Sequence, residues 1–355
     1  MSTQQRLRTS VCVRTASRLH LGTLALRPTL SRWFGGVGVM VEDPGVEVLA
    51  LPSSEFRVEG PLADRVREFA GRYLSSTGEP HPPPLRLVVR RAAPTHVGLG
   101  TGTQLGLAVA RVLAEWINRT DVSAEELARR VGRGERSGIG VHGFDRGGLL
   151  VEGGRRARGQ EGEGARGRAS SHSPEHPTTI PPTFGALRET SPLIASHTLP
   201  DQWRWVLFIP EHGQGLHGAA ERAALARLAG QVDDHASAEL CRLVLLALLP
   251  SAVEGDFDTF SEALYEFGRR VGECFSAAQG GTYLNDDVAE LVAVLRRSGT
   301  RGVGQTSWGP TVFALAPDPD RASQIARLSA RDLPSRTYRV VVTATSKTGA
   351  HCSNE

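Results

Sequence analysis

A glycine-rich segment at residues 98–104, GLGTGTQ, is the part of this 355-residue chain best suited to hold an anion. It follows a strand-like run and precedes an apolar stripe in which Leu105, Val109 and Leu113 recur at helical spacing. Glycines let a backbone approach a ligand closely, the unpaired N–H groups of a helix start favour anions, and threonines add hydroxyl donors. We therefore expect phosphate or pyrophosphate to bind here. The segment lacks the lysine of a Walker motif, and a turn that only starts a helix is the alternative.

The surrounding patterns predict an α+β protein whose strands and helices position this loop. β-branched runs between Gly and Pro are typical of strands, and apolar residues at helical spacing are typical of helices. Strands are expected at 11–16, 37–41, 45–50, 85–92, 203–210 and 337–344, with a strand pair in 302–316 and two more strands within 134–154. Helices are expected at 62–75, 105–117, 123–132, 217–230, 234–249, 256–277, 285–297 and 319–329.

Residues 153–184 interrupt this pattern. Large apolar residues are absent from the segment until Ile180, so it buries too little surface to offset its ordering entropy. We predict a flexible Arg/Gly/Ser/Pro-rich insertion or linker there. It divides the chain into an N-terminal domain, 1–152, and a C-terminal domain, 185–355.

Charge and cysteine content narrow the function classes. The net charge is +3, and residues 153–170 alone hold five Arg against two Glu, so basic and acidic residues balance elsewhere. That segment has no aromatic residue for base stacking, so we expect a solvated linker and no nucleic-acid partner. Lys347 is the only lysine, which makes Schiff-base chemistry and a pyridoxal phosphate cofactor poor fits.

The four cysteines are far apart and lack zinc-site spacing. No apolar run in the sequence approaches the roughly 18 residues that span a bilayer, and the N-terminus lacks the apolar region of a signal peptide. We expect a cytoplasmic protein with no membrane partner.

The glycine loop is one of five ordered segments that together resemble a known family. The segments are SRLH at 17–20, RWFGGVGVMVEDP at 32–44, HVGLGTGTQL at 96–105, GERSGIGVHGFDRGG at 134–148 and GQTSWGPTVFA at 304–314. The loop is similar to the second motif of the GHMP kinase superfamily. All five segments together resemble its β-ribofuranosylaminobenzene 5′-phosphate synthase branch.

The resemblance implies a two-domain GHMP kinase-like fold, with a mixed N-terminal sheet bearing helices and a ferredoxin-like C-terminal half. It also implies that the protein joins phosphoribosyl pyrophosphate to 4-aminobenzoate or 4-hydroxybenzoate, releasing pyrophosphate and carbon dioxide, in methanopterin-type carrier biosynthesis. Mg²⁺ is the cofactor that this reaction implies, with metal ligands unassigned, and a homodimer is left open.

Two alternatives remain at this stage. A GHMP-type small-molecule kinase would need a base, and many superfamily kinases have an Asp after Ser-Gly-Ile, where this chain has Gly140. Asp145 lies five residues further along. A non-catalytic phosphoribosyl-binding protein is the other alternative, because Ala25 stands where the family resemblance leads us to expect an acidic residue.

Candidate site residues follow from the charge that must be stabilised as pyrophosphate leaves. Arg18, Arg32 and Arg136 are candidates for bidentate contacts to phosphate or to the aryl carboxylate, and His20 and His96 are candidate donors to an anionic oxygen. We expect catalytic roles for His20, Arg32, His96 and Arg136. Substrate or phosphate contacts are expected from Arg18, Gly98, Gly100, Thr101, Gly102, Thr103, Gln104, Ser137, Thr306, Ser307 and Gly309. Both histidines could instead be buried residues beside glycine turns.

Overall fold

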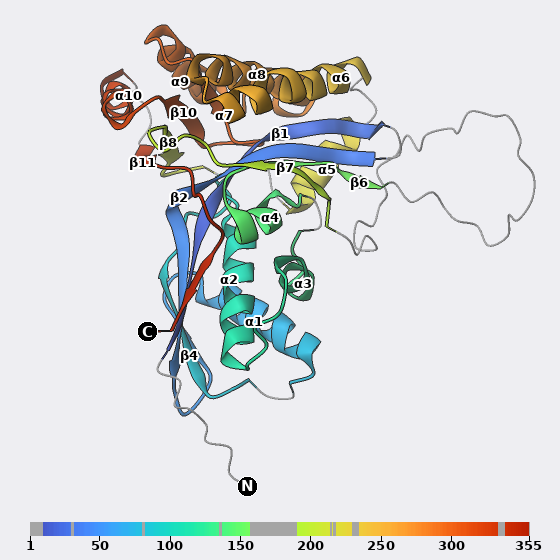
Figure 1. Cartoon of the computed structure of the whole chain (residues 1–355), viewed down its shortest axis with the longest axis vertical. Helices are drawn as coiled ribbons and strands as arrows, with labels where there is room; N and C mark the ends of the chain where they lie inside the picture. Colours follow the sequence, from blue (N-terminus) through green and yellow to red (C-terminus); the bar gives the residue numbers. More distant parts are fainter. Residues whose placement is uncertain are drawn as a thin grey trace, which may run out of the picture.

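Two long antiparallel strands run through the whole molecule, with helices on both halves (Figure 1). The computed structural model describes residues 10–29, 32–79, 82–134, 137–156, 190–213, 215, 218–228, 234–332 and 338–354. Strand β1 covers Val11–Thr29 and strand β2 covers Arg32–Pro52. The separate strands expected at 37–41 and 45–50 are therefore parts of one strand, because the turn-like residues between them form an irregularity within β2 instead of ending it.

The first sheet is built around β1 and β2. Its order is β12-β1-β2-β4-β3, with β5 and β6 also paired to β2 and β7 paired to β5. The bounds are β3 (Arg57–Glu59), β4 (Leu85–Arg91), β5 (Leu149–Glu152), β6 (Arg155–Arg156), β7 (Leu193–His197) and β12 (His351–Ser353). Two segments from the predicted C-terminal domain, β7 and β12, thus complete the sheet of the N-terminal half. The first residues of the predicted flexible insertion, 153–184, include β6, which pairs with β2, and residues 157–184 lie outside the described residues.

Four helices accompany this sheet: α1 (Ala63–Thr77), α2 (Thr101–Trp116), α3 (Ala124–Arg130) and α4 (Ile139–Arg146). Helix α2 is almost wholly apolar on its buried side, and its Leu105, Val109 and Leu113 join one core with Val48 and Leu87 of the sheet. The Ser123 hydroxyl accepts a hydrogen bond from the Glu126 N–H and caps α3.

Helix α4 corrects the prediction of two strands within 134–154, because the structure forms one helix and then β5. Its glycines allow the close packing that overrides their poor helix propensity. A Cβ on Gly143 would lie 2.3 Å from the Met40 sulfur, so α4 rests directly on β2.

The second sheet is antiparallel and has the order β11-β8-β10-β9. Its strands are β8 (Arg204–Pro210), β9 (Val303–Gln305), β10 (Val312–Ala316) and β11 (Tyr338–Thr343). Its helices include α5 (Gly218–Leu228), α8 (Phe257–Gln279), α9 (Asp286–Arg297) and α10 (Pro319–Asp332). A strand, helices, two strands, a helix and a strand follow one another along the chain, and with the spatial order β11-β8-β10-β9 they form a ferredoxin-like half, which confirms the expected fold class.

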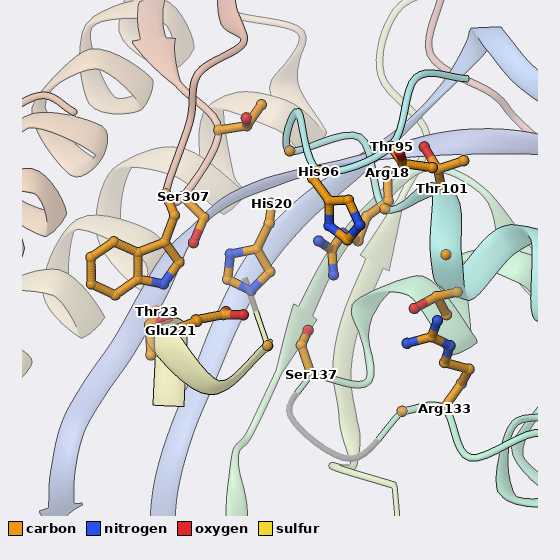
Figure 2. A pocket seen from close by; sticks show the side chains of 18 of the residues that line it. Arg18, His20, Thr23, Thr95, His96, Thr101, Arg133, Ser137, Glu221 and Ser307 are labelled. Carbon is orange, nitrogen blue, oxygen red and sulfur yellow. The ribbon is translucent and has the colours of Figure 1, made fainter. Parts of the chain in front are cut away.

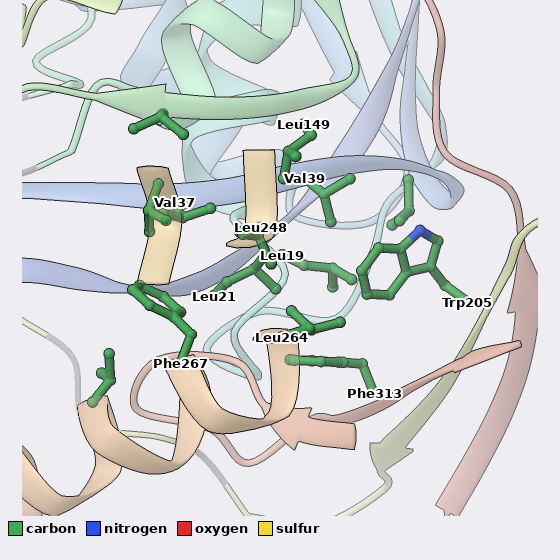
Figure 3. Packing of buried hydrophobic residues seen from close by; sticks show 14 of the residues in the cluster. Leu19, Leu21, Val37, Val39, Leu149, Trp205, Leu248, Leu264, Phe267 and Phe313 are labelled. Atoms are coloured by element: carbon green, nitrogen blue, oxygen red, sulfur yellow. The ribbon is translucent and has the colours of Figure 1, made fainter. Parts of the chain in front are cut away.

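A shared core joins the two halves. Leu19 and Leu21 of β1 and Val37 of β2 pack against Leu264 and Phe267 of α8 (Figure 3). The C-terminal part of β1 and the N-terminal part of β2 therefore pack in the core shared with the second half. The N-terminal part of β1 and the C-terminal part of β2 pack in the core of the first half.

One helical run, Asp234–Glu254, has the length and hydropathy of a membrane span, the only such run in the described part of the chain. It comprises α6 (Asp234–Leu243), the π-helical turn η2 (Val244–Leu248) and α7 (Leu249–Glu254). Leu240, Val244 and Leu248 recur every four residues and are buried in the shared core. Core helices of soluble proteins meet the same criterion, so this run is weak evidence for a membrane.

Candidate active site

A cavity of about 630 Å³ lies where the glycine loop meets the second half of the chain. Most residues predicted from the sequence line it: Arg18, His20, His96, Gly98, Gly100, Thr101, Gly102, Thr103, Ser137, Thr306, Ser307 and Gly309. Figure 2 shows the side chains of Arg18, His20 and His96 gathered around the same space. Segments from all five motifs therefore meet at one site, although they lie far apart in the sequence.

Two predicted residues lie elsewhere. Arg32 donates from Nη1 to the Gly154 carbonyl at 2.8 Å and does not line the cavity, so the structure supports a strand-pairing role instead of catalysis. Gln104 is fully buried and donates to the Gly140 carbonyl at 2.7 Å, and it also accepts from the Thr15 hydroxyl. Its two amide atoms are both used within the protein. Arg136 lies outside the described residues.

The glycine loop has the backbone shape that its composition suggests. Gly98 and Gly100 have φ angles of 91° and 69°, in the left-handed region that glycine adopts without strain. Gly100 is the N-cap of α2 and no side chain caps the helix, which leaves N–H groups of the first turn available to an anion. The Thr101 hydroxyl, however, donates to the Pro94 carbonyl at 2.7 Å, so it is not the free donor that we expected.

The loop between β9 and β10 closes the cavity from the other half. The Ser307 N–H donates to the His20 carbonyl at 2.9 Å, which links this loop directly to β1. Three residues on the cavity, Phe34, His96 and Ser307, have positive φ angles of 68°, 61° and 38°. Such conformations cost energy for residues other than glycine and persist where surrounding contacts hold them, often at functional sites.

Arginines concentrate at the α2 end of the cavity. Arg18 lines it from β1, and Arg65 and Arg133 line it from α1 and from the loop after α3. Neither Arg65 nor Arg133 was among the predicted site residues. Arg65 stands in a helix with several other arginines, so no pattern singled it out, whereas the glycines on both sides of Arg133 in 132–134 were a usable signal.

The side of the cavity at Ser307, away from Arg133 in Figure 2, adds apolar and aromatic side chains to the polar ones of Thr23 and Glu221. Phe34, Leu225 and Trp308 line it, and the Trp308 ring stacks on Phe275 with centroids 4.3 Å apart and planes 8° apart. Phe275 is itself buried in α8, so the stacking fixes the tryptophan. This end suits a flat apolar group.

The His20 imidazole stands between the two ends and is neutral. Burial, and to a lesser degree the nearby Arg18 charge, lowers its pKa to about 3. Its Nδ1 is buried without a hydrogen-bond partner in the described structure. A neutral ring can donate or accept one hydrogen bond at each nitrogen, so His20 suits a polar contact to a ligand better than an ionic one.

Two carboxyl groups line the cavity, those of Glu152 and Glu221. Glu152 is 1% exposed, and burial raises its pKa even though Ser137 and the Gly138 N–H hydrogen-bond to it. Glu221 lies beside Thr23 and His20, away from Arg133 (Figure 2). The described residues contain no group of three or more His, Cys, Asp or Glu side chains that could hold a metal. The donors at the α2 end are arginines, which do not fit a protein-held Mg²⁺ site there.

Gly140, where the resemblance leads us to look for a kinase base, lies next to residues that line the cavity. A Cβ at this position would lie 3.3 Å from Thr103 Cγ2 and 3.6 Å from Arg18 Cδ. Asp145 does not line the cavity, and burial raises its pKa. His142, from the same segment, forms a hydrogen bond through Nε2 with the Ser191 carbonyl at 2.7 Å.

Comparisons with known proteins agree with this architecture. Residues 63–148 match the GHMP kinases N terminal domain and residues 248–329 match the GHMP kinases C terminal family. Solved structures with the same fold include homoserine kinase from Cytophaga hutchinsonii, with a TM-score of 0.62, 14% identity and coverage of 99% of this chain and 100% of that one. Mevalonate pyrophosphate decarboxylase from Streptococcus pyogenes has a TM-score of 0.61 and 12% identity, with coverage of 96% and 98%.

Similarity to curated proteins identifies a narrower family than the domain matches do. The beta-ribofuranosylphenol 5'-phosphate synthase of Archaeoglobus fulgidus is 32% identical over 317 residues, which is 85% of this chain and 87% of that protein. The enzyme of the same name from Methanothermobacter thermautotrophicus is 30% identical, over 85% and 88% of the two chains. Together with the GHMP kinase domain matches, this similarity shows that the chain belongs to the beta-ribofuranosylphenol 5'-phosphate synthase family of enzymes.

Proposed function

We propose that this protein is a phosphoribosyltransferase that condenses phosphoribosyl pyrophosphate with 4-hydroxybenzoate or 4-aminobenzoate. The observation behind this proposal is the division of one cavity into an arginine-rich end at the start of α2 and an aromatic end at Trp308. A phosphorylated sugar suits the first end and a benzoate ring suits the second. The name of the relatives, which refers to a phenol product, favours 4-hydroxybenzoate.

The reaction needs close positioning more than covalent help from the protein. The ring carbon that bears the carboxylate forms a bond to ribose C1, and the bond from C1 to pyrophosphate breaks with its electron pair going to the leaving oxygen. Loss of carbon dioxide then returns its bonding electrons to the ring and restores aromaticity. Arg18 and the glycine loop would stabilise the leaving charge, and the Trp308 wall would hold the ring over C1.

Phosphoryl transfer is the second candidate, because the structural neighbours include kinases. The absence of a carboxylate at Gly140, the position that faces Thr103 and Arg18, argues against it. A non-catalytic phosphoribosyl-binding protein would bind its ligand in the same cavity without converting it to product. We place the protein in the cytoplasm without nucleic-acid or membrane partners, with a homodimer left open.

One assay separates these functions. Purified protein is incubated with phosphoribosyl pyrophosphate and each carboxyl-labelled benzoate, with and without EDTA, and carbon dioxide and pyrophosphate are measured together. We expect both products in equal amounts. Arg18→Gln should reduce them strongly, whereas Arg14→Gln, on the same strand but paired to Glu47 at 3.2 Å, should not. ADP release from ATP with alcohols would instead favour a kinase, and binding without product would favour the non-catalytic alternative.

A further inference from the structure

Two arginines outside the recognised motifs meet at the first turn of α2. Arg65 comes from the first turn of α1, and Arg133 comes from the loop after α3. Their guanidinium carbons lie 5.6 Å and 5.0 Å from the centre of the same ring, that of Phe69. Phe69 is 1% exposed, so a rigid aromatic ring orients both cations.

Gly102 marks the point where they converge. A Cβ on Gly102 would lie 2.9 Å from Nη2 of Arg133 and 3.4 Å from Nη2 of Arg65. Gly102 is in the first turn of α2, where helix N–H groups and the positive end of the helix dipole favour an anion. Two guanidinium groups and a helix start therefore point to one small region of the cavity wall.

Holding two like charges together costs energy unless an anion lies between them. Arg65 forms no ion pair with a carboxylate in the described part of the chain, and its buried Nε has no hydrogen-bond partner there. Left-handed glycines, Gly132 and Gly134 with φ angles of 67° and 78°, flank Arg133 and set the path of its loop. Arg65 therefore brings a positive charge without a carboxylate partner among the described residues to this cavity wall, which favours an anionic ligand.

We propose that Arg65 and Arg133, together with the first turn of α2, form a clamp for the diphosphate group of the substrate. This inference rests on the proposed function for the identity of the substrate. Each planar guanidinium can donate two parallel hydrogen bonds to phosphate oxygens, so the pair matches two linked phosphates better than one. As the C1–O bond breaks, the charge that develops on pyrophosphate falls at the clamp and is stabilised there. The clamp provides positive charge at the end of the cavity where the described residues do not fit a protein-held magnesium.

Titration calorimetry with inorganic pyrophosphate and, separately, ribose 5-phosphate tests the clamp. We expect Arg65→Gln and Arg133→Gln each to weaken pyrophosphate binding by about tenfold or more, the effect of losing one charge-assisted contact. Ribose 5-phosphate binding should change much less. Arg67→Gln is the matched control, because Arg67 is exposed on the same helix and pairs with Asp64 at 2.6 Å.

Two conservative variants keep the test decisive if a glutamine variant fails to fold. Arg65→Lys and Arg133→Lys retain a cation on Phe69 but lose the planar fork, so they should bind pyrophosphate more weakly than the wild type. Unchanged pyrophosphate affinity, or an equal loss for ribose 5-phosphate, would overturn the clamp. Clamp-dependent pyrophosphate binding in a protein that forms no product would instead leave the clamp standing and refute the proposed reaction.

Discussion

Gly98 lies directly against the side chain of Thr306. A Cβ on Gly98 would come 1.9 Å from Thr306 Oγ1 and 3.0 Å from its Cβ. The two residues belong to the glycine loop and to the loop between β9 and β10, so their contact closes the cavity between the two halves of the protein. Only a residue without a side chain fits at position 98.

Gly98→Ala should therefore damage both stability and activity. The methyl group meets Thr306 and also occupies a φ of 91°, which together should cost about 1–3 kcal/mol of unfolding free energy. Urea unfolding and the product assay measure the two effects. Gly71→Ala is the matched control, because nothing lies within 4 Å of a Cβ at this position in α1, and alanine should raise stability slightly. Wild-type stability and activity in Gly98→Ala would contradict the close contact.

Gln104→Leu should destabilise the fold. The substitution leaves the Gly140 carbonyl and the Thr15 hydroxyl without their partner in a fully buried place, at a cost of about 1–3 kcal/mol. Denaturant unfolding of Gln104→Leu, Thr15→Val and the double variant gives their coupling, and the double variant should lose less than the sum. A loss of ligand affinity at unchanged stability would instead restore Gln104 as a ligand contact.

Local sequence patterns predicted most of this site because its residues cluster in short motifs. The glycine loop is an example: its φ angles above zero need glycine, and composition reveals that need. Gln104 was assigned to the ligand because it follows the loop, yet a helix turns its side chain toward Thr15 and Gly140, a direction set by tertiary packing. Arg65 illustrates the converse, since only the packing of α1 against α2 brings it to the cavity.

The helices and strands show the same difference between what local sequence pattern predicts and what tertiary packing decides. Helices with a strong apolar stripe, such as α8 and α9, lie close to their predicted ranges. Helix α4 was missed because its glycines lower local helix propensity, and its contact with Met40 comes from a distant strand. Strand β12 was missed because three residues at the end of the chain have no pattern of their own, and pairing with β1 defines them.

His20 should make the protein less stable in acid. Its pKa is about 3 in the folded state against 6.5 as the ordinary value, so between these values the unfolded chain binds a proton that the folded chain does not. Stability therefore falls as the pH drops below 6.5, by at most about 1.4 kcal/mol per pH unit. Urea unfolding of wild type and His20→Asn from pH 4.5 to 7.5 should show a smaller acid loss in the variant. The exposed His351→Asn controls for the loss of a histidine, and parallel curves for His20→Asn and wild type would refute the effect.

Glu152 should have the opposite pH dependence. Burial raises its pKa, so above the ordinary value of 4.5 the folded state holds a proton that the unfolded chain has lost. Its contribution to stability is present below pH 4.5 and is lost as the pH rises through the folded-state pKa. Glu152→Gln keeps an acceptor for the Gly138 N–H and has no charge to bury, so it should be near neutral at pH 4 and stabilising at pH 8.

Glu266→Gln is the matched control for Glu152→Gln, because its effect on stability should change with pH in the opposite direction. Hydrogen bonds from Arg269, opposed by desolvation and aided by Arg270, lower the Glu266 pKa to about 2. This variant should therefore destabilise the protein at pH 8 and cost progressively less as the pH falls from 4.5 toward 2. Urea unfolding of both variants at pH 4 and pH 8 tests the pair. If Glu152→Gln were the more destabilising at pH 8, the Glu152 carboxylate would have to be ionised and paired in its buried place.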